Sequence, residues 1–511
     1  MDFKKTISAK LLGLFLMLIL FVSVFPGCKK SQSDIGAALS KETGNKIFKE
    51  ISSDIFGEKM KAAITAKGKT FRNPGFITSF YLQHNFEPVM VMKHLADSGL
   101  KQALAIINKA EEHGLSPSVF KAEQLSKLLE KIYDKAEIKT VDEAYEALIA
   151  LELTSAAALS DYSNAMQFGL ISPRRIYAQY YTATTRPDSI SFRKPFETEN
   201  LTVFLDSIQP KTENYKLLQT ALRDRVAAPG LSAEETNRIL LVNLERLRWK
   251  NLPTENKYVW VNIPDYNLQV IENGKPTLQM KVCVGEGRNK NQAPSLTEYD
   301  ENDLKKDRPF NRETPQLKSM IHSVQVNPVW NIPESIATNE ITKYAAKDPY
   351  YLANNNIDVF YNGKKIDDPE TIDFASVGTG KTYTFKQRPG EDNSLGKIKF
   401  LFNNQSSVYL HDTPAKAAFN QSVRAVSHGC VRVEKPLELA QALFGTGAKF
   451  DRIEKGMASN DPKAEDIALP TKIPVYLSYF TCWKDSNSGS LKFVKDVYGL
   501  DAVLYTHLTR I

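Results

Sequence analysis

Cysteine is scarce in this chain, with four among 511 residues. That is too few for a fold held by disulfides, and no CxxC pair indicates a zinc site. Excess positive charge is also small: 66 Lys and Arg against 59 Asp and Glu leave a net charge of +7, and no basic run with interleaved aromatics indicates nucleic-acid binding. The 42% hydrophobic and 24% charged residues that are present are typical of a globular protein. At about 150 residues per domain, the length allows roughly two to four domains.

Long apolar runs are missing except at the amino terminus. Three lysines in the first ten residues precede an apolar stretch from Leu11 to Phe25, which ends at Gly27-Cys28. A basic start, an apolar core and a small residue at the cut site are typical of a secretory signal. The junction resembles a bacterial lipoprotein processing site, so residues 1–28 are predicted to be a lipoprotein signal with Cys28 as the lipidated residue.

An uncleaved membrane anchor is the alternative, because the 18 residues from Leu11 to Cys28 are at the lower limit for spanning a bilayer. Both alternatives place the chain from residue 29 onward outside the cytoplasm. We therefore expect a membrane-attached protein of the cell envelope, on the periplasmic side, with residues 29–46 as a polar tether.

Residues 47–248 show helical patterns. Between Lys101 and His113 the apolar residues recur on one helix face, and Gly114 then ends the helix. Ser232 and Glu235 have the spacing of a capping box at the start of another helix. The region contains no group of chemically reactive residues, so it is predicted to be an all-helical scaffold domain.

After Trp249 the pattern changes to short strands, as expected for a mostly β domain over residues 249–511. An insertion at about 333–386 interrupts it, with a helix at Pro333–Ala346 and polar loops. The fold class predicted is therefore α+β. The strand candidates, some in hairpin order, are Tyr258–Ile263, Asn267–Ile271, Leu278–Val284, Ser323–Val326, Lys397–Phe402, Val408–His411, Val431–Val433 and Val475–Phe480.

One group of residues in the β domain has the composition of a catalytic site. His411 ends a strand, and Cys430 follows it by 19 residues at the start of another strand. A cysteine nucleophile needs its thiolate, which a neighbouring imidazole generates. Gly429 lets a substrate carbonyl approach, and its N–H and that of Cys430 would form an oxyanion pocket.

Two other interpretations of the same residues stay open at this point. Cys430 could be a small buried cysteine beside a hydrogen-bonded histidine, with no catalytic role. The second alternative is a metal site formed by His411, Asp412, His428 and Cys430, although their spacing matches no usual zinc pattern.

The motif Ser427-His428-Gly429-Cys430 with an upstream histidine resembles the active site of the bacterial L,D-transpeptidases, whose catalytic domain is of the YkuD type. Further segments are similar to the large multidomain subgroup of that family, which has a helical scaffold domain. They include Phe80-Tyr81, His113–Pro117, Gly169–Pro173, Glu245–Trp249, Val261–Pro264, Asn327–Pro333, Gln387–Phe400, Tyr409–Pro414 and Ile473–Tyr479. The resemblance covers roughly residues 75 to 500. One departure is that about 25 residues separate Leu218 from Leu244, too few for the peptidoglycan-binding module usual in the subgroup.

The resemblance implies a role for each matching residue. Cys430 is expected to be the nucleophile and His411 the base, with the backbone of His428, Gly429 and Cys430 as the oxyanion pocket. The insertion at 333–386 is expected to be a lid over the peptide. The residues expected to bind substrate are Arg432, Arg424, Trp330 and Asn327, and no metal or cofactor is expected.

The activity implied is a peptidoglycan L,D-transpeptidase acting on stem peptides. Cys430 would form a thioester with release of D-alanine, and an amine of a second stem would then give a 3–3 cross-link. The alternatives are an L,D-carboxypeptidase that hydrolyses the same bond, or a non-catalytic scaffold protein of the envelope. Cys283 and Cys482 are predicted to be buried free thiols, with a disulfide as the alternative.

Overall fold

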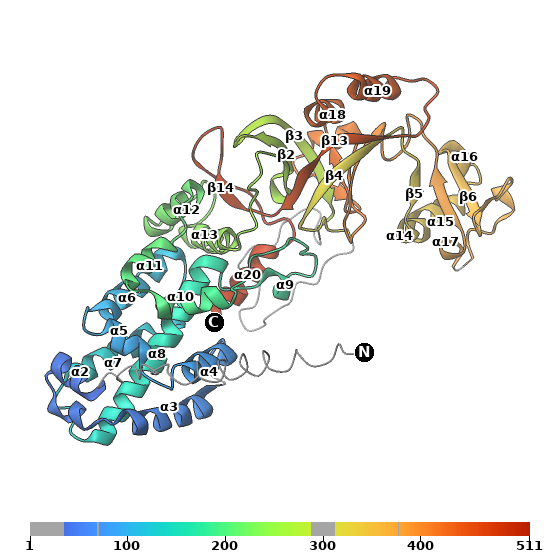
Figure 1. Cartoon of the computed structure of the whole chain (residues 1–511). Helices are drawn as coiled ribbons and strands as arrows, with labels where there is room; N and C mark the ends of the chain where they lie inside the picture. The colour runs from blue at the N-terminus through green and yellow to red at the C-terminus, as the bar shows by residue number, and fades with distance from the viewer. Residues whose placement is uncertain (1–34, 69–70, 288–311, 377) are drawn as a thin grey trace, which may run out of the picture. The chain divides into compact units, whose positions relative to one another are not determined.

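A computed structural model describes residues 35–68, 71–287, 312–376 and 378–511 (Figure 1). The α+β class predicted from the sequence is confirmed: helices precede a β-rich region. The chain divides into two compact units, one of residues up to Lys101 together with Gln124–Ala157, the other of Gln102–Glu123 together with Ala158–Ile511. No helix of the described residues is long and apolar enough to cross a membrane.

The first unit is helical. Its elements are α2 (Ile35–Thr43), η1 (Lys46–Glu50), α3 (Ser53–Lys67), α4 (Pro74–Gln83), α5 (Val89–His94), the beginning of α6 (Gly99–Ile107), α7 (Ala122–Tyr133) and α8 (Val141–Phe168) as far as Ala157.

Helix α2 corrects the expectation of a polar tether over residues 29–46. Ile35 and Leu39 are both 2% exposed, and the Asn45 side chain donates a hydrogen bond of 3.1 Å to the Ile138 carbonyl. Burial of these apolar side chains outweighs the polar composition, so this segment is part of the first unit from Ile35 onward.

The predicted signal or anchor and its lipidation site, Cys28, lie outside the described residues. The two cysteines whose pairing was left open, Cys283 and Cys482, are buried free thiols, as predicted.

Glu152 of α8 is buried in the first unit and receives three hydrogen bonds. The donors are the Tyr81 hydroxyl at 2.6 Å and the backbone N–H groups of Met90 and Val91 at 2.9 and 2.8 Å. The last two belong to the first turn of α5, so the carboxylate caps that helix. Burial raises the pKa of Glu152 to about 7, although the three hydrogen bonds oppose this rise.

The second unit begins with helices. They are η3 (Ala110–His113), η4 (Pro117–Phe120), α9 (Pro173–Ile176), α10 (Ser189–Glu197), α11 (Leu201–Ser207), α12 (Glu213–Arg223) and α13 (Ala233–Arg248), and the chain ends in α20 (Leu500–Thr509). The capping box predicted at the start of α13 is half confirmed, since the Ser232 hydroxyl accepts a hydrogen bond of 3.1 Å from the Glu235 N–H.

Helix α13 is joined to α20 by a buried ion pair. Arg246 Nη1 donates to Asp501 Oδ1 at 2.5 Å, and the Thr481 hydroxyl donates to Asp501 Oδ2 at 2.6 Å. Both charged side chains are 1% exposed. Removing one partner of such a pair costs about 3–5 kcal/mol, because the other charge stays buried.

Trp249 packs edge-on against Tyr177 and Tyr180, and all three belong to the hydrophobic cluster that also fills the β-sheet. The helices just before the sheet therefore share its core. The sequence analysis placed a domain boundary between residues 248 and 249, whereas the contacts divide the chain within α8, after Ala157.

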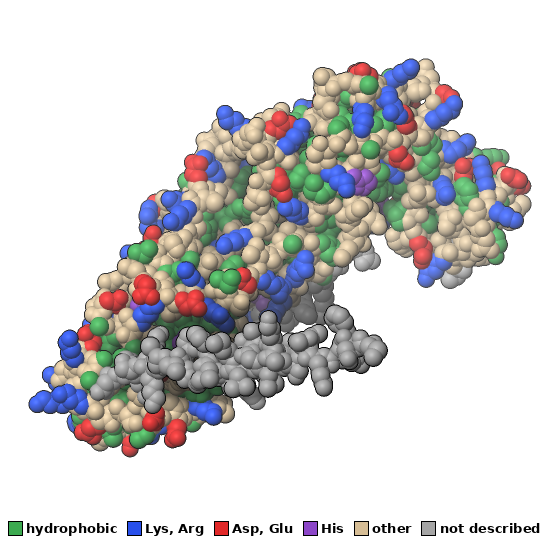
Figure 2. Space-filling model, viewed as in Figure 1, with side chains coloured by type: hydrophobic (Ala, Val, Ile, Leu, Met, Phe, Trp, Pro, Cys, Tyr) green, Lys and Arg blue, Asp and Glu red, His purple; other side chains and the backbone are tan. Residues whose placement is uncertain are grey.

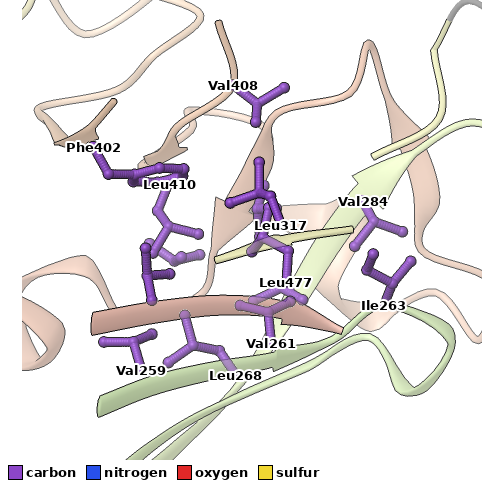
Figure 3. Close-up of a cluster of buried hydrophobic side chains, with 14 of the residues drawn as sticks. Val259, Val261, Ile263, Leu268, Val284, Leu317, Phe402, Val408, Leu410 and Leu477 are labelled. Carbon is purple, nitrogen blue, oxygen red and sulfur yellow. The ribbon is translucent and has the colours of Figure 1, made fainter. Parts of the chain in front are cut away.

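The main sheet has nine strands in the order β11-β3-β12-β10-β9-β4-β13-β1-β2, and an additional β2–β3 pairing closes eight of them into a ring. The strands are β1 (Lys257–Asn262), β2 (Asn267–Glu272), β3 (Lys275–Gly285), β4 (Leu317–Val326), β9 (Ile398–Phe402), β10 (Leu410–His411), β11 (Ala425–Ser427), β12 (Val431–Val433) and β13 (Glu465–Ser478). Every strand predicted from the sequence is present, but β4 and β13 begin six and ten residues earlier than predicted. Figure 3 shows side chains of β1, β4, β10 and β13 converging on one apolar interior.

Residues 330–387 form a cap subdomain, described except for residue 377. Its four strands are β5 (Trp330–Ile332), β6 (Ile357–Tyr361), β7 (Lys364–Lys365) and β8 (Thr384–Gln387), and its helical turns are α14 (Glu334–Ile336), η6 (Ala337–Ile341), α15 (Thr342–Ala345), α16 (Tyr351–Asn354), η7 (Pro369–Thr371) and α17 (Thr379–Thr382). The sequence analysis predicted one helix and polar loops here. The helical stretch is present, but the strands were missed, and Ile357, Val359 and Phe385 pack in a core separate from that of the main sheet.

The remaining elements follow or flank the sheet: η5 (Ile263–Asp265), η8 (Lys416–Asn420), α18 (Pro436–Phe444), α19 (Ala448–Met457), β14 (Cys482–Lys484) and β15 (Leu491–Phe493). On the face shown in Figure 2, acidic and basic side chains are intermixed.

Candidate active site

Two adjacent parallel strands place the predicted catalytic residues on one face of the sheet. In β10 and β12, Leu410 lies opposite Val431 and His411 lies opposite Arg432. Leu410 and Val431 point into the apolar core, so the residues on either side of them point the other way. Cys430 and His411 therefore face the same side, and both line a cavity of about 690 Å³.

This cavity lies between the cap subdomain and that face of the main sheet, and we call it the cleft. Trp330, Ile336 and Glu340 of the cap subdomain form part of its wall. On the sheet side its lining includes Tyr409, His411, His428, Cys430 and Arg432.

The imidazole of His411 is buried and anchored at one nitrogen. Its Nδ1 lies 2.5 Å from the Asp412 carbonyl oxygen. A carbonyl only accepts hydrogen bonds, so Nδ1 carries the proton. Nε2 therefore has a free lone pair and is able to accept a proton. Burial, followed by the positive charge of Arg432, lowers the pKa of His411 to about 4. The ring is therefore neutral at neutral pH.

The side chain of Asp412 serves a different purpose from its carbonyl. Its carboxylate accepts hydrogen bonds from the Lys397 N–H at 2.9 Å and from Lys416 Nζ at 2.5 Å. Gly396 lies so close that a Cβ there would be 2.4 Å from the carboxyl group. The carboxylate thus fixes the backbone turn, and the carbonyl beside it orients His411. The sequence analysis considered Asp412 only as a metal ligand and missed this role.

Cys430 carries a thiol that burial keeps protonated. Desolvation raises the pKa of Cys430 to about 11. The neighbouring Tyr409, together with the charges of Arg432 and Lys399, partly opposes this rise in the pKa. The sequence analysis expected the imidazole to ionise the cysteine. The raised pKa of the thiol and the lowered pKa of the imidazole instead leave both groups neutral at rest.

A glycine is required at position 429 by the backbone conformation, and not by a lack of room for a side chain. Its φ is +115°, a conformation that residues with a Cβ rarely adopt, whereas a Cβ there would meet only atoms at 3.6 Å and beyond. Its N–H donates to the Ser427 hydroxyl at 3.1 Å. Of the two N–H groups predicted for the oxyanion pocket, that of Gly429 is thus engaged by Ser427, while that of Cys430 has no acceptor among the described residues.

His428 contacts the cap subdomain through its side chain. Its Nε2 lies 2.6 Å from Glu340 Oε1, which also accepts a hydrogen bond of 2.7 Å from Arg312 Nη2. Arg312 Nη1 in turn donates to Glu286 Oε2 at 3.1 Å. From the sequence, His428 was assigned to the oxyanion pocket through its backbone or, in the alternative, to a metal site. Glu340 was given no role, because nothing in the spacing of residues 340 and 428 indicates that they meet.

The four predicted substrate-binding residues fall into two groups. Trp330 and Arg432 line the cleft. Asn327 does not: it is 5% exposed and its amide donates to the Gly456 carbonyl at 2.8 Å. Arg424 does not either, because its guanidinium donates to the backbone carbonyls of Val282, Gln421 and Tyr266. Both are structural residues that fix local backbone.

Among the described residues, no three His, Cys, Asp or Glu side chains gather closely enough to hold a metal ion. The site that the strands build is thus a thiol and a neutral imidazole beside backbone donors, an arrangement suited to acyl transfer.

Comparison with known proteins agrees with this chemistry. Residues 256–447 match the L,D-transpeptidase catalytic domain, YkuD, and residues 75–222 match the Scaffold domain. The chain therefore carries a YkuD-type L,D-transpeptidase catalytic domain after a Scaffold domain. A protein of Haemophilus influenzae that carries the provisional name of an L,D-transpeptidase is 30% identical over 325 residues, or 63% of this chain. The match spans 60% of that relative's length.

Proposed function

We propose that this protein is a peptidoglycan L,D-transpeptidase that forms 3–3 cross-links through a thioester on Cys430. The observation that carries the proposal is the pairing of β10 with β12, which puts the Cys430 thiol and the His411 imidazole in one cleft, with Nδ1 of the ring held by the Asp412 carbonyl. Backbone anchoring of this kind leaves Nε2 as the proton acceptor.

In the first half-reaction, Cys430 Sγ attacks the carbonyl that joins the third stem residue, a diamino acid, to a terminal D-alanine. The thiol proton passes to His411 Nε2 as the S–C bond forms. The C–N bond then breaks, and the proton returns from Nε2 to the departing amine of D-alanine. Because the thiol is neutral at rest, attack and proton transfer are coupled, and the uncharged pair suits a desolvated cleft.

In the second half-reaction, the side-chain amine of another stem attacks the thioester. The new C–N bond forms, the C–S bond breaks, and the amine proton returns to the sulfur through His411. Water competes for the same thioester, so the cap subdomain that walls the cleft has a function in keeping water away. Arg432 and Trp330 are the residues we assign to substrate binding, and no cofactor takes part.

We further propose that the protein works on the periplasmic side of the cell envelope, attached to the membrane through Cys28 as a lipoprotein or through an uncleaved anchor. The substrate is polymeric and lies outside the cytoplasm, so this location agrees with the chemistry proposed for the cleft.

Purified protein incubated with tetrapeptide muropeptides tests the activity. Mass spectrometry is expected to find cross-linked dimers and free D-alanine, and Cys430→Ala is expected to give neither. Tripeptides without dimers would identify an L,D-carboxypeptidase instead. If folded wild-type protein released no D-alanine and formed no Cys430 adduct with a carbapenem, it would be a non-catalytic scaffold.

A further inference from the structure

We propose that Glu340 is a positioning residue that fastens the cap subdomain to the loop of the nucleophile, and so decides how much of the thioester is passed to an amine rather than to water. The inference deepens the function proposed above and rests on it.

The cap subdomain is built so that it can move as a rigid body relative to the main sheet. It has a hydrophobic core separate from that of the main sheet. Its connection to the rest of the second unit is a neck around Pro328 and Arg388, where the Asn393 amide donates to the carbonyls of both residues at 3.0 and 2.8 Å. The neck fixes one side of the cap subdomain. Contacts elsewhere determine whether the cleft stays covered.

Glu340 supplies such contacts on the side that faces Cys430. Its Oε1 lies 2.6 Å from His428 Nε2 and 2.7 Å from Arg312 Nη2, and all three side chains line the cleft. Hydrogen bonds in which the donor or the acceptor is ionised are about twice as strong as neutral ones. His428 is two residues before Cys430, so the carboxylate of the cap subdomain is tied directly to the loop of the nucleophile.

A second path leads from Glu340 to the same loop. Arg312, held by Glu340, also donates to Glu286 Oε2 at 3.1 Å. The backbone N–H of Glu286 donates to the Ser427 carbonyl at 2.9 Å. The acidic side chain thus reaches the loop of residues 427–430 both through His428 and through Arg312 and Glu286.

The turn that presents Glu340 is itself built for a fixed geometry. Residues Ala337–Ile341 form a π-helical turn, a rare local structure that is frequent at functional sites. Gly380 packs against it so tightly that a Cβ would lie 2.6 Å from Thr338 Cα. This contact holds the turn from behind and leaves Glu340 directed at the catalytic loop.

Loss of the Glu340 carboxylate is expected to loosen the cap subdomain and admit water, while Cys430, His411 and their anchors stay in place. Acylation and release of D-alanine would then continue, but more of the thioester would be hydrolysed. A residue that served folding alone would lower both products together and leave their ratio unchanged.

The test compares Glu340→Ala and Glu340→Gln with wild type and with Asn339→Ala. Asn339 is a matched control because it lies on the same turn and lines the same cleft, yet its amide donates within the turn, to the Ser335 carbonyl at 2.8 Å. With tetrapeptide muropeptides, the ratio of dimer to tripeptide is expected to fall about tenfold in both Glu340 variants, equivalent to about 1.4 kcal/mol, and to stay at the wild-type value in Asn339→Ala. An unchanged ratio in Glu340→Ala would overturn the proposal.

Hydrogen exchange keeps the two proposals separable. If wild type makes no dimers at all, transpeptidation is refuted, and the role of Glu340 is decided by amide exchange in the loop of residues 427–430. Faster exchange in Glu340→Ala than in wild type and Asn339→Ala would support the fastening role even for a hydrolase. Equal exchange in all three proteins would refute it.

Discussion

The Ser427 hydroxyl closes the loop of residues 427–430 by donating a hydrogen bond of 2.6 Å to the Cys430 carbonyl oxygen. The same oxygen atom of Ser427 accepts the Gly429 N–H. One side chain therefore satisfies two backbone groups within four residues and holds the conformation of the loop of residues 427–430.

Replacement of Ser427 tests this arrangement. Ser427→Ala is expected to slow acylation of Cys430 by a carbapenem about tenfold, because removing a buried partner costs about 1–3 kcal/mol. Stopped reactions analysed by intact mass give the rate. Ser427→Thr keeps the hydroxyl and is expected to retain most of the acylation rate. An unaffected rate in Ser427→Ala would contradict the role of the Ser427 hydroxyl in holding the loop.

The protonation states of Cys430 and His411 predict an unusual pH profile. Because the pKa of Cys430 is raised to about 11 and the pKa of His411 is lowered to about 4, the resting pair is uncharged between these values. The thiolate fraction then rises about tenfold per pH unit below the thiol pKa. The rate at which iodoacetamide alkylates Cys430 is therefore expected to rise steadily from pH 6 to pH 9. Peptide-level mass spectrometry measures this rate. A plateau near neutral pH would indicate a preformed thiolate–imidazolium pair.

The carbonyl of Asp412, not its carboxylate, is expected to orient the catalytic imidazole. His411→Gln removes the proton acceptor and should lower the acylation rate by about 10²–10⁴-fold. Asp412→Asn keeps the carbonyl and one side-chain acceptor for the Lys397 N–H, so a loss of less than about tenfold is expected. Equal losses in the two variants, measured with the same carbapenem, would mean that the carboxylate itself acts on the imidazole.

The buried Glu152 predicts that the helical unit loses stability as the pH rises. The pKa of Glu152 is raised to about 7 in the folded state, so its stabilising effect is complete below pH 4.5, declines as pH increases and is lost above about 7. The full change is about 3 kcal/mol. Glu152→Gln has no such proton to lose. Denaturant unfolding of both proteins at pH 5 and pH 8 should therefore show a larger loss for wild type, and equal losses would contradict the prediction.

The strands and the reactive pair could be predicted from the sequence because their patterns are local. The alternation in Tyr258–Ile263 and the turn before Leu278 are sufficient to predict hairpins, and a histidine at one strand end with a cysteine at another indicates a site. The polar tether was mispredicted from residue 35 onward because the burial of Ile35 and Leu39 depends on the packing of α2 against η1 and α5, which the polar composition does not reveal. The short strands of the cap subdomain were missed for a similar reason, since only tertiary packing separates them from polar loops.

Side-chain roles were harder to predict than positions. Arg424 and Arg432 look alike in the sequence, one on each side of the motif, yet one binds backbone carbonyls and the other lines the cleft. Glu340 and His428 are 88 residues apart, and no periodicity relates them. Similarly, the sequence indicates a cysteine near a histidine, but the protonation of both depends on how deeply the fold buries them.

The buried pair of Arg246 and Asp501 has a practical consequence for dividing this protein. The matched catalytic segment, residues 256–447, contains neither residue, nor Trp249, nor the strand β13 that runs between β1 and β4. A fragment cut at those limits would expose the interior of the sheet and leave β1 and β4 without their common neighbour. The segment that matches the family model is thus smaller than the structural unit whose hydrophobic core is complete. A fragment intended to fold must begin ahead of α13 and continue through α20.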